Sequence, residues 1–329
     1  MQLEKRQVLV TGATGFLGSY LVQELVQRGC RVRAFAHYRS DPGTGNLASL
    51  PREVTSGVEM FWGDVCDRDC VNAAMKDVEV VFHLAALIGI PYSYHAPASY
   101  LAVNAGGTLN LLQAARQAGV ARFVHTSTSE VYGSAQYTPI DEQHPLVGQS
   151  PYSASKIAAD KLAESFRCSF DLPVVTVRPF NAFGPRQSER AIVPTIISQR
   201  LAGIDPVVIG NPDAIRDLTY AQDTARGFVL AAACDQAVGQ TFNLGSGQSI
   251  SIGQLAELIC ELTGGGSYHS EAQRLRPAQS EVRELHADAS RAAAVLGWHT
   301  TRTLRQGLLA TIEFLRAHPE RCQPTRYVI

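Results

Sequence analysis

The stretch Gln7-Val8-Leu9-Val10-Thr11-Gly12-Ala13-Thr14-Gly15-Phe16-Leu17-Gly18 decides the fold. Its apolar first part is typical of a buried strand, and the pattern from Phe16 to Arg28 predicts a helix that Gly29 ends. Glycines between a strand and a helix permit a tight turn and let the backbone approach a pyrophosphate. The free N–H groups at the start of the helix also favour an anion. We therefore predict a dinucleotide-binding turn, although the spacing Gly12-x-x-Gly15-x-x-Gly18 is looser than G-x-G-x-x-G.

Short apolar runs alternate with helical patterns through the first half of the chain, which predicts a parallel sheet with crossover helices. Further strands are expected at 31–36, 58–62, 79–84, 121–125 and 174–178, and helices at 67–76, 98–118 and 152–170. After Pro179 the regular alternation of strand and helix patterns ends, and the expected elements become shorter. Residues 181–186 are expected to form a loop, followed by helices at 193–201, 221–233 and 304–317 and strands at 207–209 and 241–244.

This pattern predicts an α/β fold with two domains. Residues 1–179 would form a Rossmann-type doubly wound parallel sheet that binds the dinucleotide, joined by returning segments near 218–245. Residues 180–329 would mainly form a smaller α/β substrate domain, partly interleaved with the first.

The composition is that of an ordinary globular protein, with 329 residues, 45% hydrophobic and 18% charged. A net charge of -1 without a basic stripe argues against a nucleic-acid partner. The chain enters its first strand without a signal peptide, and no apolar run is long enough for a membrane helix. The seven cysteines are scattered, and the nearest pair, Cys66 and Cys70, lacks the partners of a zinc site. We expect a cytoplasmic protein with no metal and no membrane partner.

The end of the second strand bears on the choice of cofactor. An acidic residue there would hold the ribose 2′-OH of NAD, but the chain reads Phe35-Ala36-His37-Tyr38-Arg39-Ser40. Arg39, together with His37, would suit a 2′-phosphate, so NADP is slightly favoured over NAD, unless Arg39 is only a solvated loop residue. Asp64, after the third strand, is placed to accept a hydrogen bond from an adenine amino group.

A second group of candidate functional residues lies between His125 and Lys156. The strand 121–125 leads into Ser127-Thr128-Ser129-Glu130, and Tyr152 and Lys156 follow, one helical turn apart on a shared face. A lysine ammonium favours the phenolate of a nearby tyrosine, so the pair is able to move a proton near neutral pH. The alternative is the solvated first turn of a surface helix.

Taken together, these residues resemble the extended short-chain dehydrogenase/reductase family that acts on nucleotide sugars. The matching motifs span nearly the whole chain in family order: Gly12-x-x-Gly15-x-x-Gly18, Gly63-Asp64-Val65, His83-Leu84-Ala85-Ala86, Asn104, Tyr152-x-x-x-Lys156, Arg178-Pro179-Phe180-Asn181, Gly184-Pro185-Arg186, Arg216-Asp217 and Leu296-Gly297-Trp298.

The resemblance implies a set of binding residues. An NAD(P) cofactor would be held at the glycine turn, the strand ends and the acid/base pair by Gly12, Thr14, Gly15, Phe16, Leu17, Gly18, His37, Arg39, Asp64, Val65, Leu84, Ala85, Ala86, Asn104, Tyr152, Lys156 and Pro179. A nucleotide-sugar substrate would meet Tyr92, Asn181, Val193, Arg216 and Arg276. Asn181 and Arg216 would bind the diphosphate, and Arg276 is either a further ligand of the diphosphate or only a surface charge.

The resemblance also implies catalytic roles for Thr128, Ser129, Glu130, Tyr152 and Lys156. Tyr152 would take the proton of the sugar 4-OH as hydride leaves C4, Lys156 would hold the nicotinamide ribose, and Thr128 would hydrogen-bond the 4-oxygen. In 4,6-dehydratases, where the pattern reads Thr-Asp-Glu, the glutamate removes the C5 proton. This chain has Ser129 in place of the acid, so Glu130 would serve as both base and acid, or a water relayed by Ser129 would protonate the leaving hydroxyl.

Other reactions remain open at this point. Ser129-Glu130 also resembles the UDP-glucuronate decarboxylases, whereas 4-epimerases usually have a small or apolar residue at the position of Glu130. Glu130 could also be only a structural acceptor. A non-catalytic cofactor-binding sensor is a further alternative, against which the intact Tyr152 and Lys156 count.

Three wider stretches favour one branch of the family. Residues 87–95, 126–133 and 148–156 look like the NDP-N-acetylglucosamine 4,6-dehydratases of the legionaminic-acid type, with an aromatic loop from Tyr92 to His95 beside the sugar. The leading prediction is therefore an NAD(P)-dependent nucleotide-sugar 4,6-dehydratase, a lyase. The resemblance also implies a homodimer formed through the helices at 98–118 and 152–170.

Overall fold

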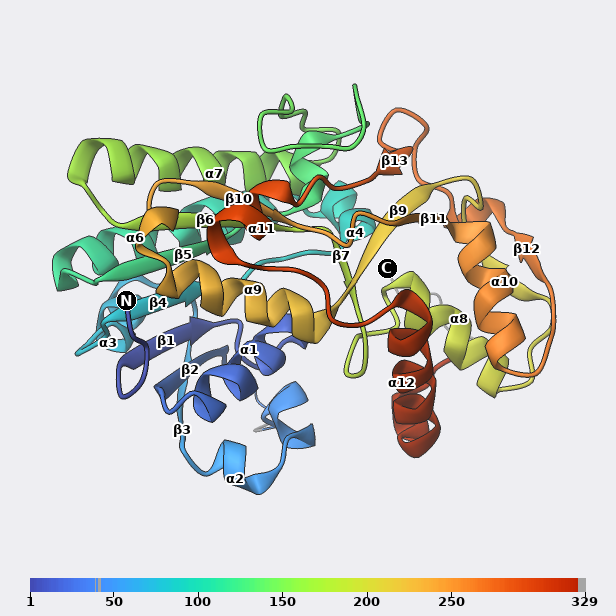
Figure 1. Ribbon diagram of the computed structural model, residues 1–329, viewed down its shortest axis with the longest axis horizontal. Coiled ribbons are helices and arrows are strands. Elements are labelled where there is room, and N and C mark those ends of the chain that lie inside the picture. Colours follow the sequence, from blue (N-terminus) through green and yellow to red (C-terminus); the bar gives the residue numbers. More distant parts are fainter. Residues whose placement is uncertain (39, 41–42, 325–329) are drawn as a thin grey trace.

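Two layers of helices enclose a parallel sheet in the computed structural model, which describes residues 1–38, 40 and 43–324 (Figure 1). Within this part of the chain, seven parallel strands form one sheet in the order β10-β6-β5-β4-β1-β2-β3. Their bounds are Gln7–Thr11 (β1), Arg31–His37 (β2), Val58–Gly63 (β3), Val80–His83 (β4), Arg122–Thr126 (β5), Val174–Pro179 (β6) and Thr241–Leu244 (β10). The predicted Rossmann-type α/β class is therefore confirmed.

Each face of the sheet packs against its own set of helices. One face buries its apolar side chains against α1 (Phe16–Gln27), α9 (Ala221–Ala233) and α11 (Ser290–Leu296). The other face does so against α3 (Arg68–Ala74), α6 (Gly107–Ala118) and α7 (Pro151–Phe170). Because both faces are covered, the strands are near-continuous apolar runs, as is usual for parallel sheets.

The strand order reverses direction between β1 and β4, which are neighbours in space although β2 and β3 separate them in sequence. In doubly wound sheets, ligands bind outside the carboxyl ends of the strands at this switch point. The segments that follow β1 and β4 are the glycine turn and His83-Leu84-Ala85-Ala86. The topology thus brings two of the predicted motifs to one place.

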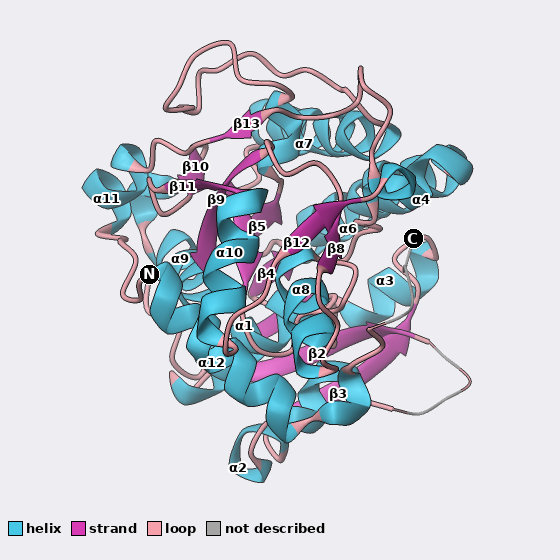
Figure 2. Cartoon of the chain, turned by 90° about the vertical axis from the view of Figure 1, so that its right-hand side faces the viewer, coloured by secondary structure: helices cyan, strands magenta, loops and turns pink. Residues whose placement is uncertain are grey.

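A second lobe lies to the right of the sheet in Figure 1, and its helices α8, α10 and α12 face the viewer in Figure 2. Its apolar core joins these helices to β7, β8 and β9. The bounds in this lobe are Asn181–Phe183 (β7), Ile192–Leu201 (α8), Val207–Ile209 (β8), Ile215–Tyr220 (β9), Ser249–Ser251 (β11), Ile252–Leu262 (α10), Tyr268–Ser270 (β12), Glu284–Leu285 (β13) and Leu304–Ala317 (α12). The division into domains at Pro179 stays a prediction, which limited proteolysis is able to check.

Three sequence predictions need correction. Residues 181–183 are the strand β7 rather than loop, because they pair in parallel with β9. The helix predicted over 98–118 is divided into α5 (Pro97–Tyr100), a wider π-helical stretch (Leu101–Gly106) and α6. The aromatic segment predicted as a loop is the short helix α4 (Ile90–His95), which Pro91 starts.

The short elements complete the chain. They are α2 (Arg52–Thr55) and the 3-10 turns Gly45–Ser49, Ser129–Tyr132, Asp235–Ala237, Ala272–Arg274 and Pro319–Arg321. Among the described residues, no helix combines the length and the apolar character needed to cross a bilayer. Cytoplasmic location stays a prediction.

A buried aspartate on α9 links the returning segment to the residues between α11 and α12. The carboxylate of Asp223, on α9, accepts hydrogen bonds from the backbone N–H of Thr301 at 2.9 Å and from its hydroxyl at 2.6 Å. The carbonyl of Asp223 accepts from the indole N–H of Trp298 at 2.8 Å. Since Thr301 lies two residues before Thr303, the N-cap of α12, this contact ties the main sheet to the second lobe.

Candidate active site

The glycine turn is held close against the end of β4. The hydroxyl of Thr11 accepts hydrogen bonds from the backbone N–H groups of Leu84 and Ala85, both at 3.1 Å. Gly12 has a φ of +68°, and a Cβ there would lie 2.9 Å from the Ala85 nitrogen. At Gly18, a Cβ would collide with the carbonyl of Gly12. Only glycine fits either position, so the turn presents bare backbone at the switch point.

The start of α1 is open to a ligand. Gly15 precedes the helix, and within the described residues no side chain caps its first N–H groups. A helix start of this kind favours a phosphate through its free donors and partial positive charge. The turn thus fits the pyrophosphate of a dinucleotide, and Thr14, Gly15, Phe16 and Leu17 lie in it as predicted.

The remaining predicted cofactor residues lie along the carboxyl edge of the sheet. The Asp64 carboxylate accepts a hydrogen bond from the N–H of Cys66 at 2.8 Å, which orients it after β3. Val65, Leu84, Ala85, Ala86 and Pro179 follow or end strands of the same sheet. His37 is exposed at the end of β2, and Arg39 lies outside the described residues.

Asn104 has a different environment from the one predicted for a direct cofactor ligand. Its amide group donates to the carbonyl of Leu87 at 3.0 Å and to the hydroxyl of Ser155 at 2.9 Å. Its oxygen accepts from the N–H of Leu87 at 2.8 Å. Asn104, in the π-helical stretch, therefore links the segment after β4 to α7. In this position it supports the site through the backbone of Leu87 and the side chain of Ser155.

Tyr152 and Lys156 lie together on the first turns of α7. Ser150 starts this helix with a reciprocal capping box to Ser153. Both Tyr152 and Lys156 are buried, and the Lys156 ammonium donates to the carbonyl of Thr126 at 2.6 Å. The Tyr152 hydroxyl is hydrogen-bonded to the side chain of Thr128. The structure thus brings together the predicted tyrosine, lysine and threonine.

Burial controls the titration of this pair. It raises the pKa of Tyr152 above its ordinary value, against the opposing effect of the hydrogen bond with Thr128. Burial also lowers the pKa of Lys156 to about 8, while the charge of Asp160 acts in the opposite direction. The predicted lowering of the tyrosine pKa by Lys156 is therefore not what the structure shows: burial raises the pKa of Tyr152, because removal from water disfavours the charged phenolate.

Glu130 lies on the 3-10 turn that Thr128 caps. The Thr128 hydroxyl accepts from the N–H of Glu130 at 3.2 Å, and Ser129 and Glu130 are both buried. A guanidinium nitrogen of Arg276 lies 3.8 Å from the Glu130 carboxylate. That nitrogen is buried and has no hydrogen-bond partner among the described residues. Glu130 therefore lies between the acid/base pair and a cationic pocket.

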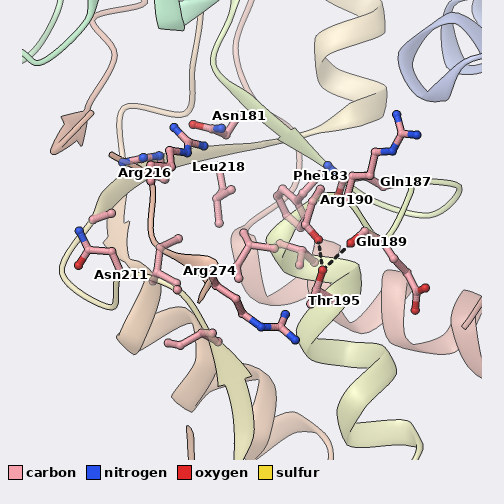
Figure 3. Close-up of a pocket in the computed structure, with 18 of the residues that line it drawn as sticks. Asn181, Phe183, Gln187, Glu189, Arg190, Thr195, Asn211, Arg216, Leu218 and Arg274 are labelled. Atoms are coloured by element: carbon pink, nitrogen blue, oxygen red, sulfur yellow. Dashed lines mark hydrogen bonds between the residues drawn. The ribbon is translucent and has the colours of Figure 1, made fainter. Parts of the chain in front are cut away.

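The pocket beside Glu130 contains most of the predicted substrate residues (Figure 3). Asn181 and Arg216 come from the paired strands β7 and β9, and Val193 comes from α8. Arg216 donates to Glu281 at 3.2 Å, and a buried oxygen of Asn181 lacks a partner within the described part of the chain. Tyr92 is half exposed on α4, whereas its neighbour Pro91 lines the pocket.

The sequence prediction missed several residues that line the same pocket. They are charged or polar and come from loops, or in one case from the 3-10 turn Ala272–Arg274: Gln187, Glu189, Arg190, Asn211, Arg274 and Glu281. Arg274 and Arg276 are separated by one residue in a basic segment of the sequence. This pair of cations was a usable signal for an anion-binding site. The guanidinium groups give the pocket a chemistry suited to a dianionic diphosphate.

Comparison with known proteins identifies the family. The family model described as GDP-mannose 4,6 dehydratase matches residues 9–311. The chain belongs to this family. The predicted membership of the extended short-chain dehydrogenase/reductases that act on nucleotide sugars is thereby confirmed, whereas the legionaminic-acid type is not shown.

Relatives within the family differ in reaction. A UDP-glucose 4-epimerase of Mycolicibacterium smegmatis is 34% identical, over 94% of this chain and 98% of its own. A dTDP-glucose 4,6-dehydratase of Actinoplanes sp. is 31% identical, over 95% of this chain and 98% of its own. Membership of the family therefore does not by itself decide between epimerisation and dehydration.

Solved structures support the cofactor. DesIV, the dTDP-glucose 4,6-dehydratase of Streptomyces venezuelae, was solved with NAD bound and matches with a TM-score of 0.89 and 26% identity, over 97% of this chain and 100% of its own. MoeE5, solved with UDP-glucuronic acid and NAD, matches with a TM-score of 0.84 and 33% identity, over 94% of this chain and 99% of its own. These neighbours support a nicotinamide cofactor at the glycine turn.

The buried ammonium predicts an unusual stability profile. The pKa of Lys156 is about 8 in the fold against 10.5 when unfolded, so the unfolded chain binds more protons between these values and stability rises with pH there. Lys156→Met should therefore stabilise the protein at pH 7, by about 1–3 kcal/mol once the lost hydrogen bond is deducted. The advantage should shrink as the pH rises from 8 to 10.5. Urea denaturation at several pH values measures it.

Lys161→Met is the matched control, because Lys161 lies on the same helix but is exposed. It should change the free energy of unfolding by about 0.5 kcal/mol or less at every pH. A Lys156→Met variant that is less stable than the parent at pH 7 would contradict the prediction.

Proposed function

We propose that this protein is an NAD(P)-dependent nucleotide-sugar 4,6-dehydratase that acts on an NDP-N-acetylglucosamine. The observation that carries the proposal is the position of the Glu130 carboxylate, on the same turn as Thr128 and 3.8 Å from Arg276. A base at this place suits removal of a proton from the sugar C5. The substrate's C2 group rests on the resemblance of residues 87–95, 126–133 and 148–156 alone.

The proposed chemistry begins at C4. A nicotinamide cofactor held at the glycine turn would supply the hydride acceptor for this step and the hydride donor for the last one. Tyr152 takes the proton of the 4-hydroxyl, with Thr128 holding the oxygen, and the product of this step is a C4 ketone. Lys156 holds the ribose and supplies a positive charge beside the phenolate. Asn181, Arg216 and Arg276 bind the diphosphate through charge-assisted hydrogen bonds.

Elimination follows at C5 and C6. The C4 ketone acidifies the C5 proton, which Glu130 removes. The C6 hydroxyl leaves with a proton supplied by Glu130 itself or through a water held by Ser129, and a C5–C6 double bond forms. Hydride return to C6 and a proton to C5 complete the 4-keto-6-deoxy sugar, with net loss of one water.

A decarboxylase is the second candidate, because Ser129 replaces the usual acid. A UDP-glucuronic acid decarboxylase of Xenopus tropicalis is 30% identical over 99% of this chain and 76% of its own. In that reaction the C5 carboxylate would leave as CO₂ and no acid for a hydroxyl would be needed. A 4-epimerase is a third possibility, against which the buried carboxylate of Glu130 counts.

Product mass spectrometry in D₂O tests the reaction. UDP- and GDP-N-acetylglucosamine, UDP-glucose and UDP-glucuronate serve as separate substrates. Loss of water with deuterium gained at C5 is the expected result. Loss of CO₂ from the glucuronate would replace the proposal with a decarboxylase, and an unchanged formula with altered stereochemistry would replace it with an epimerase.

Glu130→Gln separates oxidation from elimination. This variant should still reduce the cofactor when the sugar is added, because Tyr152 and Lys156 remain, but loss of water should fall about 10²–10⁴-fold. Absorbance at 340 nm follows the first step and mass spectrometry the second. Glu313→Gln, on the exposed face of α12, is the control and should behave as the parent. Full dehydration by Glu130→Gln would remove Glu130 from the mechanism.

The preference for NADP belongs to the proposal as well. It rests on the sequence of residues 35–40, which contains no carboxylate, and on His37, which is exposed at the end of β2. Isothermal titration should give a smaller dissociation constant for NADP⁺ than for NAD⁺, and His37→Ala should reduce the difference. Tighter binding of NAD⁺ by the parent would show that this site accepts a free 2′-hydroxyl.

We also propose a homodimer formed through α6 and α7. Leu101, in the π-helical stretch before α6, and Phe170, the last residue of α7, are 57% and 44% exposed, and a partner would bury them. Sedimentation equilibrium should give twice the monomer mass, and Leu101→Glu should shift the protein toward monomer. A parent that sediments as a monomer at micromolar concentration would refute this interface.

A further inference from the structure

A buried carboxylate lies behind the acid/base pair. Asp160 is one helical turn beyond Lys156 on α7 and is only 5% exposed. Its Oδ1 accepts from the Nε2 of His125 at 2.9 Å. Its Oδ2 accepts from the hydroxyl of Ser127 at 2.7 Å and from the guanidinium of Arg178 at 3.0 Å. One side chain thus joins α7 to β5, to the residue after β5 and to β6.

These bonds hold the segment that carries the catalytic threonine. Lys156 fastens the carbonyl of Thr126 to α7, and Asp160 fastens the hydroxyl of Ser127 one residue later. Thr128 comes next in the chain and is hydrogen-bonded to Tyr152. The position of Thr128 relative to the tyrosine therefore depends on two attachments to the same helix.

The charge of Asp160 also matters, because the groups around it are mostly cationic or neutral. They lie on three elements: Lys156 and Tyr152 on α7, His125 on β5 and Arg178 on β6. Burial raises the pKa of Asp160, yet the His125 hydrogen bond and the Arg178 charge lower it to about 2. Burial keeps His125 neutral by lowering its pKa. Asp160 thus forms an ion pair with Arg178, and its charge also acts on Lys156, one helical turn away on the same helix.

We propose that Asp160 is the positioning residue of the acid/base centre: it fixes residues 126–128 against α7 and is the counter-charge, one helical turn away, for Lys156. The proposal rests on the proposed roles of Tyr152 and Lys156. It adds a residue that does not touch the substrate and that the sequence motifs did not single out.

Asp160→Asn removes the charge and keeps the hydrogen bonds. The amide oxygen in the place of Oδ2 would still accept from Ser127 and Arg178. The amide nitrogen in the place of Oδ1 would donate to His125, whose proton would move to Nδ1. That Nδ1 is buried and has no partner among the described residues, so the change of tautomer breaks no existing bond. The variant is therefore suited to isolate the electrostatic part.

Lysine NMR measures this part without any substrate. The sequence contains four lysines, so ¹³Cε-lysine labelling gives four signals, and Lys156→Arg assigns the one of interest. In Asp160→Asn the titration midpoint of Lys156 should fall by one pH unit or more, and in Asp160→Glu it should stay close to that of the parent. Asp223→Asn, another buried aspartate that accepts several hydrogen bonds, is the control and should leave the midpoint unchanged. An unchanged midpoint in folded Asp160→Asn would overturn the counter-charge role.

Ser127→Ala tests the positional part. It removes one attachment of residues 126–128 and no charge, so kcat should fall about tenfold or more, with KM and the Lys156 midpoint unchanged. The high-pH limb of kcat should move to lower pH in Asp160→Asn but not in Ser127→Ala. Full kcat in Ser127→Ala would refute the attachment. If the parent turned over none of the nucleotide sugars, the proposed function would fail, and the NMR result would still decide the role of Asp160.

Discussion

The burial of opposite charges between α7 and the sheet is the constraint on which the site depends. Lys156, Asp160 and Arg178 are all buried. Burial of any one of these charges without a partner would cost free energy of folding. This cost is offset only when α7 lies in one arrangement against β5 and β6, because Asp160 on α7 accepts its hydrogen bonds from His125 on β5, Ser127 just after β5 and Arg178 on β6. The geometry of the acid/base pair is therefore fixed by the interior of the protein and not by its surface loops.

The substrate side of the site has a different origin. Asn181 and Arg216 meet because β7 pairs with β9, and these strands belong to a small sheet that the first half of the chain does not form. Glu130 and Arg276 come from segments almost 150 residues apart in sequence and approach to 3.8 Å. In the proposed function, the main sheet would supply the groups for proton transfer and cofactor binding, and the second lobe would supply the cations for a diphosphate. The active site exists only where the two adjoin.

Much of the main sheet could be predicted from sequence, for a local reason. Runs such as Gln7–Thr11 and Val174–Pro179 are apolar and end in Gly or Pro signals, so their positions follow without knowledge of their partners. The strand β9 was missed because Ile215–Tyr220 mixes Arg216 and Asp217 with apolar residues and is stabilised by pairing with distant strands. The start of α10 carried a usable signal, the capping box from Ser251 to Gln254, that went unused.

The candidate site divides in the same way. Gly12, Tyr152 and Lys156 belong to short motifs with recognisable spacing, so they could be named in advance. Arg190 and Asn211 lie in no motif and reach the pocket through the packing of the second lobe. Asp160 resembles any polar residue on an amphipathic helix until its three donors are seen. Residues whose role depends on long-range contacts are the ones that sequence patterns do not reveal.

The position of β10 at the edge of the main sheet has a consequence for synthesis of the chain. β10 pairs with β6, but residues 180–240, which include most of the pocket-lining segments, leave the ribosome between them. At about 5–20 residues per second, the edge of β6 stays unpaired for several seconds of translation. During that interval the nascent chain presents an open strand edge to its neighbours. The first part of the second lobe, from β7 to β9, thus emerges before the main sheet is complete, and the rest of the lobe follows β10.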